Sequence, residues 1–438
     1  MKVAFYTLGC KVNHYETEAM RELFEAAGHE SVPFSEAADV YVVNTCTVTQ
    51  VSDQKSRHML ARAHRRNPEA LVVAVGCYAQ TAPETVAALA GVSLVIGTDG
   101  RREIVQRVEA ALAAGAPAQS TVHDLGGVRT FEELSAVSDG RTRATLKIQD
   151  GCRNFCTYCA IPYARGPLRS RPLSSIRAEL VRLAGAGYRE VVLTGIHLAS
   201  WGLDSGEGDL VDVLRMAGET GIGRIRLGSL EPKFCDERFA GAVAALRQIC
   251  PQFHLSLQSG SDAVLRRMNR RYDTAAYARA VALLRQASPG CAITTDVIAG
   301  FVGETEQEHR ETLAFAEEMA FARMHVFPYS RRKGTKADAM PGHLPRAVRE
   351  ARAAELIALG DRLERAYVAG LVGREADVLI ESDGTGYTEN YVRTRVETAG
   401  TPCREGELVH VRIAGAEGAL AVGTPCCAPI GRAGNTLE

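Results

Sequence analysis

Three cysteines lie close together in the segment from Asp150 to Cys159, and their number and spacing indicate a chemical role. Cys152, Cys156 and Cys159 form a Cys-x3-Cys-x2-Cys pattern, which supplies three thiolates from one short loop. A 4Fe-4S cluster has four irons, so three cysteine ligands leave one iron free to bind a small molecule. Zinc sites use two Cys-x2-Cys pairs or a Cys/His quartet, and no second pair follows nearby. The pattern therefore favours a cluster with an open iron over zinc or three packed thiols.

A second set of three cysteines is spread along the N-terminal part of the chain. Each follows an apolar, β-branched run that is short enough to be a buried strand. These runs cover residues 2–9, 38–45 and 71–76, and the cysteines that follow them are Cys10, Cys46 and Cys77. Considered singly, each cysteine is also compatible with an ordinary place in a buried core.

The segments between these runs determine whether the three cysteines can meet. Residues 15–27 and 52–66 are amphipathic and predict helices, with Asn13 and Ser52 as N-caps. Strand–helix alternation predicts a parallel, doubly wound sheet, in which the loops at the carboxyl ends of the strands share one edge. The N-terminal cysteines are then expected to form a second three-thiolate cluster site.

Length and composition limit the number of domains and the possible functions of the chain. The chain has 438 residues, enough for two or three domains. Its start lacks the pattern of a signal peptide, and no apolar run reaches membrane-spanning length, so we expect a cytoplasmic protein with no membrane partner. In a reducing compartment, 12 cysteines indicate metal or redox chemistry rather than disulfides. A net charge of −1 means that any nucleic-acid contact must come from local basic patches.

The pattern along the chain predicts three domains of an α/β protein. Residues 1–115 carry the doubly wound pattern, and residues 116–140 form a polar linker. Strand-like and helical runs alternate in residues 141–370, which predicts a partial βα barrel with its chemistry at the carboxyl ends of the strands. Residues 371–432 have short strands and frequent glycine, which predicts a small β-barrel of the nucleic-acid-binding type.

The whole chain, with a triad of cysteines in each of its first two domains, resembles the radical S-adenosylmethionine (SAM) methylthiotransferase family. That family joins a three-cysteine N-terminal domain, a radical SAM domain and a C-terminal, OB-like TRAM domain. Four strings are similar to the branch that modifies N6-threonylcarbamoyladenosine in tRNA, at residues 7–13, 193–198, 227–232 and 325–330. The branches that act on isopentenyladenosine and on a ribosomal-protein aspartate carry Gly-Cys-Gln-Met-Asn and Gly-Cys-x-Lys-Asn at the first cysteine. This chain has Gly-Cys-Lys-Val-Asn there. Val302 is a departure, because the family usually has proline at that position.

The resemblance implies insertion of a methylthio group at C2 of N6-threonylcarbamoyladenosine at tRNA position 37, next to the anticodon. It implies two 4Fe-4S clusters, one on each cysteine triad, and two equivalents of SAM, as methyl donor and as radical source. A one-electron reductant such as flavodoxin or ferredoxin and a sulfur source are the implied partners besides tRNA. The SAM-binding residues carried over are Tyr158, Thr194, Gly195, Gln258, Ser259 and Gly300. For Gln258 and Ser259, a turn at a strand end is the alternative.

RNA binding requires positive charge for the phosphates and a ring on which a base can stack. The predicted RNA-binding residues are Arg165, Arg331, Tyr391, Arg393, Arg395 and Arg412. Arg165 and Arg331 are also candidates to read the carboxylate of the threonylcarbamoyl group. The basic run at 266–271 is a further candidate, although any such run is also compatible with a solvated surface.

Other functions stay open at this point. Within the family, the substrate could be isopentenyladenosine in tRNA or a ribosomal-protein aspartate. Outside it, a non-catalytic iron–sulfur electron carrier would need fully ligated clusters and would not need the barrel. An RNA-binding protein with zinc would explain the C-terminal strands but not the Cys-x3-Cys-x2-Cys pattern.

Overall fold

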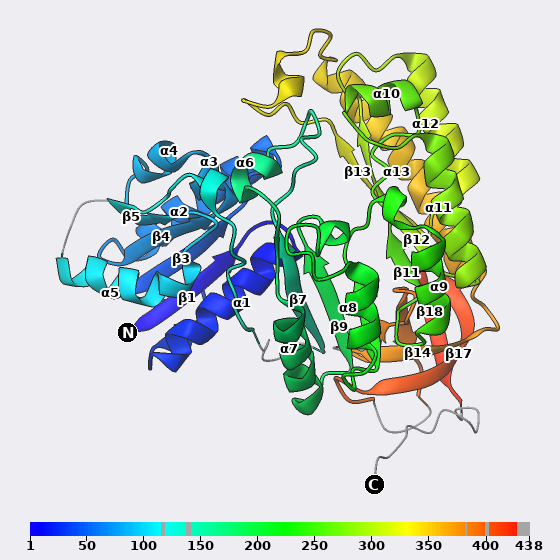
Figure 1. Ribbon diagram of the computed structural model, residues 1–438, viewed down its shortest axis with the longest axis horizontal. Coiled ribbons are helices and arrows are strands. Elements are labelled where there is room, and N and C mark those ends of the chain that lie inside the picture. The colour runs from blue at the N-terminus through cyan, green and yellow to red at the C-terminus, as the bar shows by residue number, and fades with distance from the viewer. Residues whose placement is uncertain (115–118, 137–141, 382, 399–402, 427–438) are drawn as a thin grey trace.

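The computed structural model has three units in succession: an N-terminal parallel sheet, a central partial barrel and a small closed C-terminal barrel. Figure 1 shows the N-terminal unit beside the central one, with the C-terminal barrel at one end of the latter. This confirms the predicted α/β class with its terminal β-barrel, whereas the domain boundaries stay predictions. The structure describes residues 1–114, 119–136, 142–381, 383–398 and 403–426, so the last residues of the predicted C-terminal domain lie outside it.

The N-terminal sheet buries both of its faces. Its elements are β1 (Lys2–Thr7), α1 (Lys11–Ala26), β2 (Glu30–Val32), β3 (Val40–Thr45), α2 (Gln50–Arg66), β4 (Leu71–Gly76), α3 (Cys77–Thr81), α4 (Pro83–Ala87), β5 (Val92–Ile96), η1 (Arg101–Glu103), α5 (Ile104–Ala114) and β6 (Gln119–Ser120). The strands are parallel, in the order β2-β1-β3-β4-β5-β6. Successive side chains point to opposite faces, so Val3 and Phe5 pack with α1 and α5, whereas Ala4 packs on the α2 side. β6 extends this sheet although its residues were expected in the linker.

Both predicted N-caps of this unit are wrong by three residues. Cys10 is the N-cap of α1, and Thr49 caps α2 by accepting a hydrogen bond from the Ser52 N–H at 3.1 Å. Asn13 lies inside α1 and uses its amide for tertiary contacts, donating to the Leu8 carbonyl at 2.8 Å. Sequence pattern alone does not distinguish such a tertiary hydrogen bond from a cap.

The central unit follows, after the short turn η2 (Leu125–Gly127), as an open barrel of mainly parallel strands. Its elements are β7 (Arg143–Asp150), α6 (Ile161–Arg165), β8 (Arg169–Ser170), α7 (Leu173–Gly185), β9 (Glu190–Gly195), η3 (Leu198–Ser200), α8 (Leu210–Ala217), β10 (Arg224–Leu227), η4 (Pro232–Phe234), α9 (Glu237–Ala245), β11 (Gln252–His254), α10 (Asp262–Arg267), α11 (Thr274–Ala287), β12 (Ala292–Ala299), α12 (Glu306–Met319), β13 (Arg323–Pro328), η5 (Lys336–Ala339) and α13 (Arg346–Ala369). Two sheets, β10-β9-β7-β8 and β11-β12-β13, are joined by parallel bridges such as Leu230 to Leu255.

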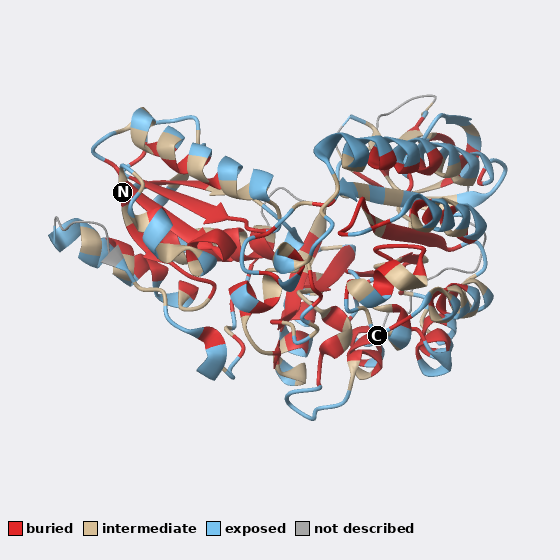
Figure 2. Ribbon diagram, turned by 90° about the horizontal axis from the view of Figure 1, so that it is seen from above, coloured by how far each residue is buried: buried red, intermediate tan, exposed pale blue. Residues whose placement is uncertain are grey.

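The outer face of this barrel is apolar and its inner face is polar. Figure 2 shows buried strands in red behind helices whose outer faces are exposed. Phe253, Ile293 and Val297 belong to the core cluster that packs with the helices. The alternating neighbours, including His254 and Asp296, therefore face the inside of the barrel.

The C-terminal barrel closes in the order β14-β15-β16-β18-β17. Its strands are β14 (Glu375–Ile380), β15 (Thr385–Tyr387), β16 (Arg393–Val396), β17 (Leu408–Glu417) and β18 (Leu420–Pro425). Closure leaves short strands without a free edge, which suits a small domain. Arg226 of β10 donates to the Glu389 carbonyl at 3.0 Å, so this barrel is docked on the central unit.

Candidate active site

Three neighbouring strands bring the N-terminal cysteines to one edge of the sheet. Cys10 follows β1, Cys46 follows β3, and Cys77 begins α3 directly after β4. These strands are adjacent and parallel, so their carboxyl ends meet. Gly9 permits close packing there, since its φ is +109° and a Cβ atom would lie 3.1 Å from Cys46 Sγ. The fold thus gathers three thiols that are far apart in the sequence.

Two thiols of this N-terminal triad are buried, and burial raises the pKa of both. Cys46 and Cys77 are buried, whereas Cys10 is exposed. Burial raises the pKa of Cys77 to about 12, and the nearby Arg165 opposes that rise. Burial also raises the pKa of Cys46. Because iron binds the thiolate form, metal binding at Cys46 and Cys77 must displace their protons.

Arg165 is a buried positive charge beside this triad. Its Nε donates to Cys77 Sγ at 3.2 Å, and its Nη2 donates to Asn13 Oδ1 at 2.7 Å. Its Nη1 donates to Glu16 Oε1 at 2.5 Å. The prediction that Arg165 contacts RNA or the threonylcarbamoyl group is wrong for this arrangement, because its guanidinium is fully buried and engaged with protein groups.

A buried ionic network joins the N-terminal sheet to the central barrel. Glu16 of α1 accepts a hydrogen bond from Lys147 of β7 at 2.7 Å, besides those from Arg165, and forms an ion pair with Arg101 at 2.6 Å. Lys147 also donates to Asp150 at 2.5 Å. Burial alone would raise the pKa of Glu16, but the three basic side chains lower it to about 2. Removing one member would leave a buried charge uncompensated, which costs about 3–5 kcal/mol.

The second triad lies in the loop between β7 and α6. Cys156 is buried, whereas Cys152 and Cys159 are half-buried. Burial raises the pKa of Cys152 to about 11 and that of Cys159 to about 12, and the neighbouring thiols add to both shifts. The loop is anchored to the barrel because the Thr157 N–H donates to the Met268 carbonyl at 3.0 Å.

Arg270 lies beside this triad and contacts one of its sulfurs, as Arg165 does at the first triad. Its Nη1 donates to Cys156 Sγ at 3.2 Å. Its Nη2 lies 3.4 Å from Glu231 Oε1, which also accepts from Asn154 of the loop at 2.7 Å. Glu231 Oε2 lies 3.2 Å from His197 Nε2. Arg270 belongs to the basic run considered for RNA, and Glu231 was not predicted, since only the tertiary fold places them at the loop.

The sulfur atoms of neither triad are as close together as the ligands of a mononuclear site. Among the described residues, the groups whose metal-ligating atoms all lie within 4.8 Å are His254/Asp296/His325 and Glu375/His410/Cys426, and neither includes a triad cysteine. Zinc holds sulfur at about 2.3 Å, so two of its sulfur ligands lie at most about 4.6 Å apart. The triads are therefore spaced for a larger inorganic centre, and a 4Fe-4S cluster with three protein ligands fits the donor set.

The two triads are connected through one helix contact. Cys77 begins α3, and α6 begins shortly after Cys159; these two helices pack against each other. Thr98 Oγ1 reinforces the contact by donating to the Ala164 carbonyl at 2.6 Å. A cavity of about 730 Å³ adjoins both helices, with Tyr78 and Tyr163 in its lining. The helices that follow the two triads therefore border one cavity between the N-terminal and central units.

Three of the predicted SAM-binding residues lie at the end of a barrel strand or in the β7–α6 loop. Thr194 and Gly195 end β9. A Cβ atom at Gly195 would lie 3.0 Å from Gln149 Oε1, so the glycine allows close packing there. Tyr158 packs edge-on against Phe301, with ring centroids 6.3 Å apart. Direct contact of these residues with SAM stays a prediction.

The other three predicted SAM-binding residues have contacts within the protein. Gln258 has φ +69°, and its N–H donates to the Asp296 carbonyl at 2.8 Å. Ser259 is fully buried, with its hydroxyl 3.1 Å from Thr312 Oγ1. The Gly300 N–H donates to Glu304 at 2.8 Å. These contacts agree with the turn alternative for Gln258 and Ser259, and their contact with SAM stays a prediction.

The predicted RNA-binding arginines other than Arg165 lie at or near the surface. Three of them have carboxylate partners: Arg331 with Asp338, Arg395 with Glu417 at 2.7 Å, and Arg412 with Glu375 at 3.0 Å. Exposed ion pairs contribute about 0–1 kcal/mol, so a phosphate can compete with these carboxylates. Arg393 is also exposed. RNA contact by these arginines stays a prediction.

Tyr391 is placed differently from the prediction. Its ring stacks on Tyr387 with centroids 4.6 Å apart, and the guanidinium of Arg226 lies 4.6 Å from its ring centroid. Arg143 of β7 lies 5.1 Å from the same ring. The ring therefore joins the two barrels, and this conflicts with its predicted role as a free stacking surface for an RNA base.

Comparison with known proteins agrees with this arrangement. Residues 2–97 match the model described as "Uncharacterized protein family UPF0004", and residues 146–316 match the Radical SAM superfamily. A radical SAM methyltransferase, TsrM, from Kitasatospora setae shares the fold, with a TM-score of 0.55 and 17% identity over 75% of this chain and 74% of that one. Among the described residues, no helix has the length and apolar character needed to cross a membrane.

Similarity to named relatives extends over most of the chain. Threonylcarbamoyladenosine tRNA methylthiotransferase MtaB of Bacillus subtilis (strain 168) is 42% identical over 93% of this chain and 96% of its own. The tRNA-2-methylthio-N(6)-dimethylallyladenosine synthase of Erythrobacter litoralis (strain HTCC2594) is 33% identical over 86% of each chain. Membership of the radical SAM superfamily implies SAM and 4Fe-4S chemistry. The two cysteine triads, the open barrel and these relatives lead to one conclusion: the chain belongs to the radical SAM methylthiotransferase family.

Proposed function

We propose that this enzyme inserts a methylthio group at C2 of N6-threonylcarbamoyladenosine at position 37 of tRNA, giving 2-methylthio-N6-threonylcarbamoyladenosine. The observation that carries the proposal is the assembly of two separate cysteine triads about the α3–α6 contact. An aromatic C–H bond at C2 has neither an acidic proton nor a leaving group, so acid–base residues cannot cleave it. The four relatives at 34–42% identity that are named for threonylcarbamoyladenosine support this substrate.

The chain contributes ligands and positioning. Cys10, Cys46 and Cys77 hold one 4Fe-4S cluster, and the cysteines of the β7–α6 loop hold the second. The bound clusters and SAM supply the radical and the methyl group. Arg165 and Arg270 each donate an N–H to a ligand sulfur, which stabilises negative charge on that sulfur. The reaction requires a one-electron reductant, such as flavodoxin or ferredoxin, and a sulfur source from outside the chain.

The test combines metal analysis with product analysis. Two clusters predict about eight irons per chain after anaerobic reconstitution. The reconstituted protein is then incubated with SAM, a reductant and tRNA carrying N6-threonylcarbamoyladenosine, and the nucleosides are analysed by mass spectrometry. We expect the 2-methylthio product from this tRNA and none from the same tRNA with isopentenyladenosine.

The alternatives give different results in the same experiment. An electron carrier would bind iron without forming product, and a zinc protein would contain zinc in place of iron. Product from the isopentenyladenosine tRNA, or from a ribosomal-protein aspartate alone, would assign the enzyme to another branch of the family.

A further inference from the structure

Two aromatic side chains beside the loop triad are exposed to solvent. Phe155 lies between Cys152 and Cys156 in the β7–α6 loop, and Tyr163 lies on α6, shortly after Cys159. Phe155 is 42% exposed and Tyr163 is 51% exposed. Their rings pack edge to face with centroids 5.8 Å apart, so they form one surface, which we call the aromatic pair.

The backbone of Phe155 is held in a conformation that an aromatic residue rarely adopts, with φ +46°. The Asn269 amide fixes the loop there, because its Nδ2 donates to the carbonyls of Asn154 at 3.2 Å and of Phe155 at 3.1 Å. The Thr157 hydroxyl donates to the Arg267 carbonyl at 2.9 Å. Backbone strain of this kind is concentrated at functional sites, where the surrounding structure imposes it. The loop is therefore ordered before any ligand binds, which lowers the entropy cost of binding.

The aromatic pair adjoins the cavity of about 730 Å³ beside α3 and α6, because Tyr163 belongs to its lining. This volume is within the range of about 300–1,000 Å³ that is typical of small-molecule sites. The lining also includes Thr47, Tyr78 and Ala160, each of which directly follows a triad cysteine. The cavity therefore lies beside chain segments that carry ligands of both triads.

The charges around the aromatic pair favour an anionic partner. Lys333 of the cavity lining and Arg153 of the β7–α6 loop are both exposed. The lining also contains two carboxylates: Asp53 is paired with Arg332 at 2.7 Å, and Glu84 is exposed. The exposed cations thus outnumber the exposed carboxylate, which suits the phosphates of a nucleic acid.

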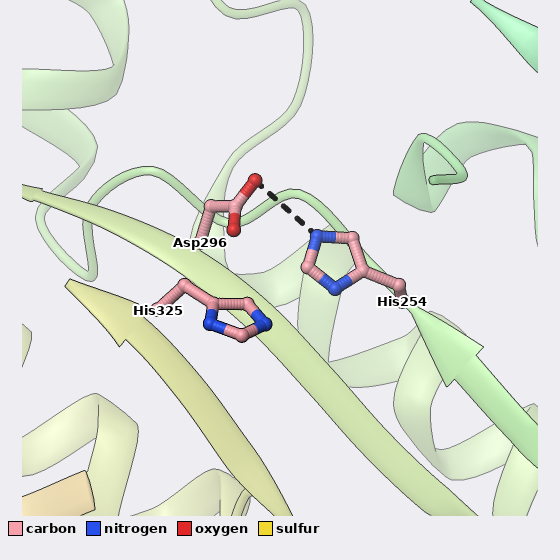
Figure 3. A group of neighbouring side chains, drawn as sticks. All are labelled: His254, Asp296 and His325. Carbon is pink, nitrogen blue, oxygen red and sulfur yellow. Dashed lines mark ion pairs between the residues drawn. The ribbon is translucent and has the colours of Figure 1, made fainter. Parts of the chain in front are cut away.

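The inner face of the central barrel has a different character. His254 of β11, Asp296 of β12 and His325 of β13 point toward one another there (Figure 3), and His254 Nε2 is 3.3 Å from Asp296 Oδ2. These polar groups form hydrogen bonds and ion pairs, whereas Phe155 and Tyr163 present aromatic rings. The aromatic pair is therefore the part of this region that suits the face of an RNA base.

We propose that Phe155 and Tyr163 form a stacking surface for unpaired bases of the tRNA anticodon loop, with Lys333 near a phosphate of the same loop. This inference rests on the function proposed above. Every base has a π face, and the bases of a loop can be placed on aromatic side chains without opening a duplex. The aromatic pair thus takes the stacking role that was predicted for Tyr391, at a place beside the triads.

The test measures binding of anticodon stem-loops that carry N6-threonylcarbamoyladenosine to the reconstituted enzyme by fluorescence anisotropy. Phe155→Leu and Tyr163→Leu keep an apolar side chain but lose the ring. Each should weaken binding about 5- to 150-fold, the range that corresponds to one stacked base. Tyr163→Phe should keep the affinity because it keeps the ring. Leu203→Ala, which shortens another exposed apolar side chain, is the control and should leave the affinity unchanged.

Two further measurements separate stacking from other contacts. Each loop nucleotide is replaced in turn by an abasic one. If one base stacks on Tyr163, Tyr163→Leu should lose no further affinity for the RNA that lacks this base. Lys333→Gln should reduce the salt slope of binding by about 1, whereas Tyr163→Leu should leave the slope unchanged.

The possible failures can be told apart. Unchanged affinity in both leucine variants, or an equal loss for every abasic RNA, would overturn the stacking surface, and methylthio product from the wild type would still uphold the proposed function. A wild type that passes the abasic test but forms no methylthio nucleoside would contradict the proposed function and leave the surface standing.

Two controls cover the position of the aromatic pair next to the cluster loop. Iron is measured in each variant, and if Phe155→Leu loses iron, the result for Tyr163→Leu on α6 decides. Product formation is compared with flavodoxin and with dithionite as reductant. Normal RNA affinity, with product lost only when flavodoxin supplies the electrons, would overturn the proposal and assign the surface to the protein reductant.

Discussion

The two cysteine triads provide similar ligands but depend on different parts of the fold. In each, one arginine nitrogen lies 3.2 Å from a cysteine sulfur and donates a hydrogen bond to it. The second triad comes from a single loop of the barrel, and Arg270 beside it is held by Glu231 of the same unit. The first triad comes from three strand ends, and its Arg165 belongs to the central unit although it contacts Cys77 of the N-terminal one. The first site therefore requires the two units to be docked, whereas the second requires only the barrel.

The largest effect should come from breaking the loop triad. Cys156→Ala leaves two cysteine ligands there, so we expect loss of both 5′-deoxyadenosine formation and methylthio product, with about half of the iron retained. Chromatographic assay of 5′-deoxyadenosine after reduction with dithionite measures this. Cys291→Ala, which changes a buried cysteine directly before β12, is the matched control and should keep both activities. Persistent SAM cleavage in Cys156→Ala would contradict the assignment.

Breaking the strand-end triad should separate the two activities. Cys46→Ala should abolish methylthio product but retain uncoupled SAM cleavage, because the loop triad is made of other residues. The measurement is the ratio of 5′-deoxyadenosine to methylthio nucleoside. A normal product yield in this variant would rule out the N-terminal triad as a functional site.

The two arginines should differ in their effect on stability. Arg165→Met leaves Glu16 and Asp150 short of a buried cation, so we expect the free energy of unfolding to fall by about 3–5 kcal/mol. Arg270→Met should cost less, about 1–3 kcal/mol, since Glu231 keeps its contacts with Asn154 and His197. Urea denaturation followed by circular dichroism measures both. Equal losses would mean that docking of the units is not what distinguishes the sites.

Acid should weaken the docking of the units through Glu16. Its pKa is lowered to about 2 in the folded protein, against about 4.3 in an unfolded chain. The folded form therefore gains stability above pH about 4.3, and this gain, about 3 kcal/mol, is lost as the pH falls toward 2. Urea midpoints of the protein before cluster reconstitution, measured from pH 5 to pH 3, should fall. Glu16→Gln should be less stable at pH 5 and show a shallower slope.

The smallest effect should come from substitutions in the C-terminal barrel, which contributes no cysteine to either triad. Arg393→Glu should weaken tRNA binding, with a defect that shrinks as salt rises and a salt slope reduced by about 1. Arg395→Glu should act less strongly, because Arg395 is already paired with Glu417 and Glu397. SAM cleavage without tRNA should be unchanged in both. Filter binding at several salt concentrations tests this, and a change in iron content would show that the barrel is not independent of the clusters.

The sequence pattern within short segments was sufficient to predict the secondary structure and the fold class. Alternating strands and amphipathic helices predicted the α/β class of the fold. The Cys-x3-Cys-x2-Cys loop was visible because all of its ligands lie in one short segment. The N-terminal triad was predicted only through a further step, the rule that parallel strands share an edge at their carboxyl ends.

The roles of charged side chains were decided by tertiary structure. Arg165 and Arg393 are both arginines near predicted functional segments, yet one is buried against Glu16 and Cys77 while the other is exposed. Tyr391 has an aromatic ring of the kind that stacks on RNA bases, but this ring contacts Arg226 and Tyr387. The sequence by itself determined which ligands and elements this protein has. Only the folded chain determined which charges are paired, because ion pairing depends on distances between residues far apart in the sequence.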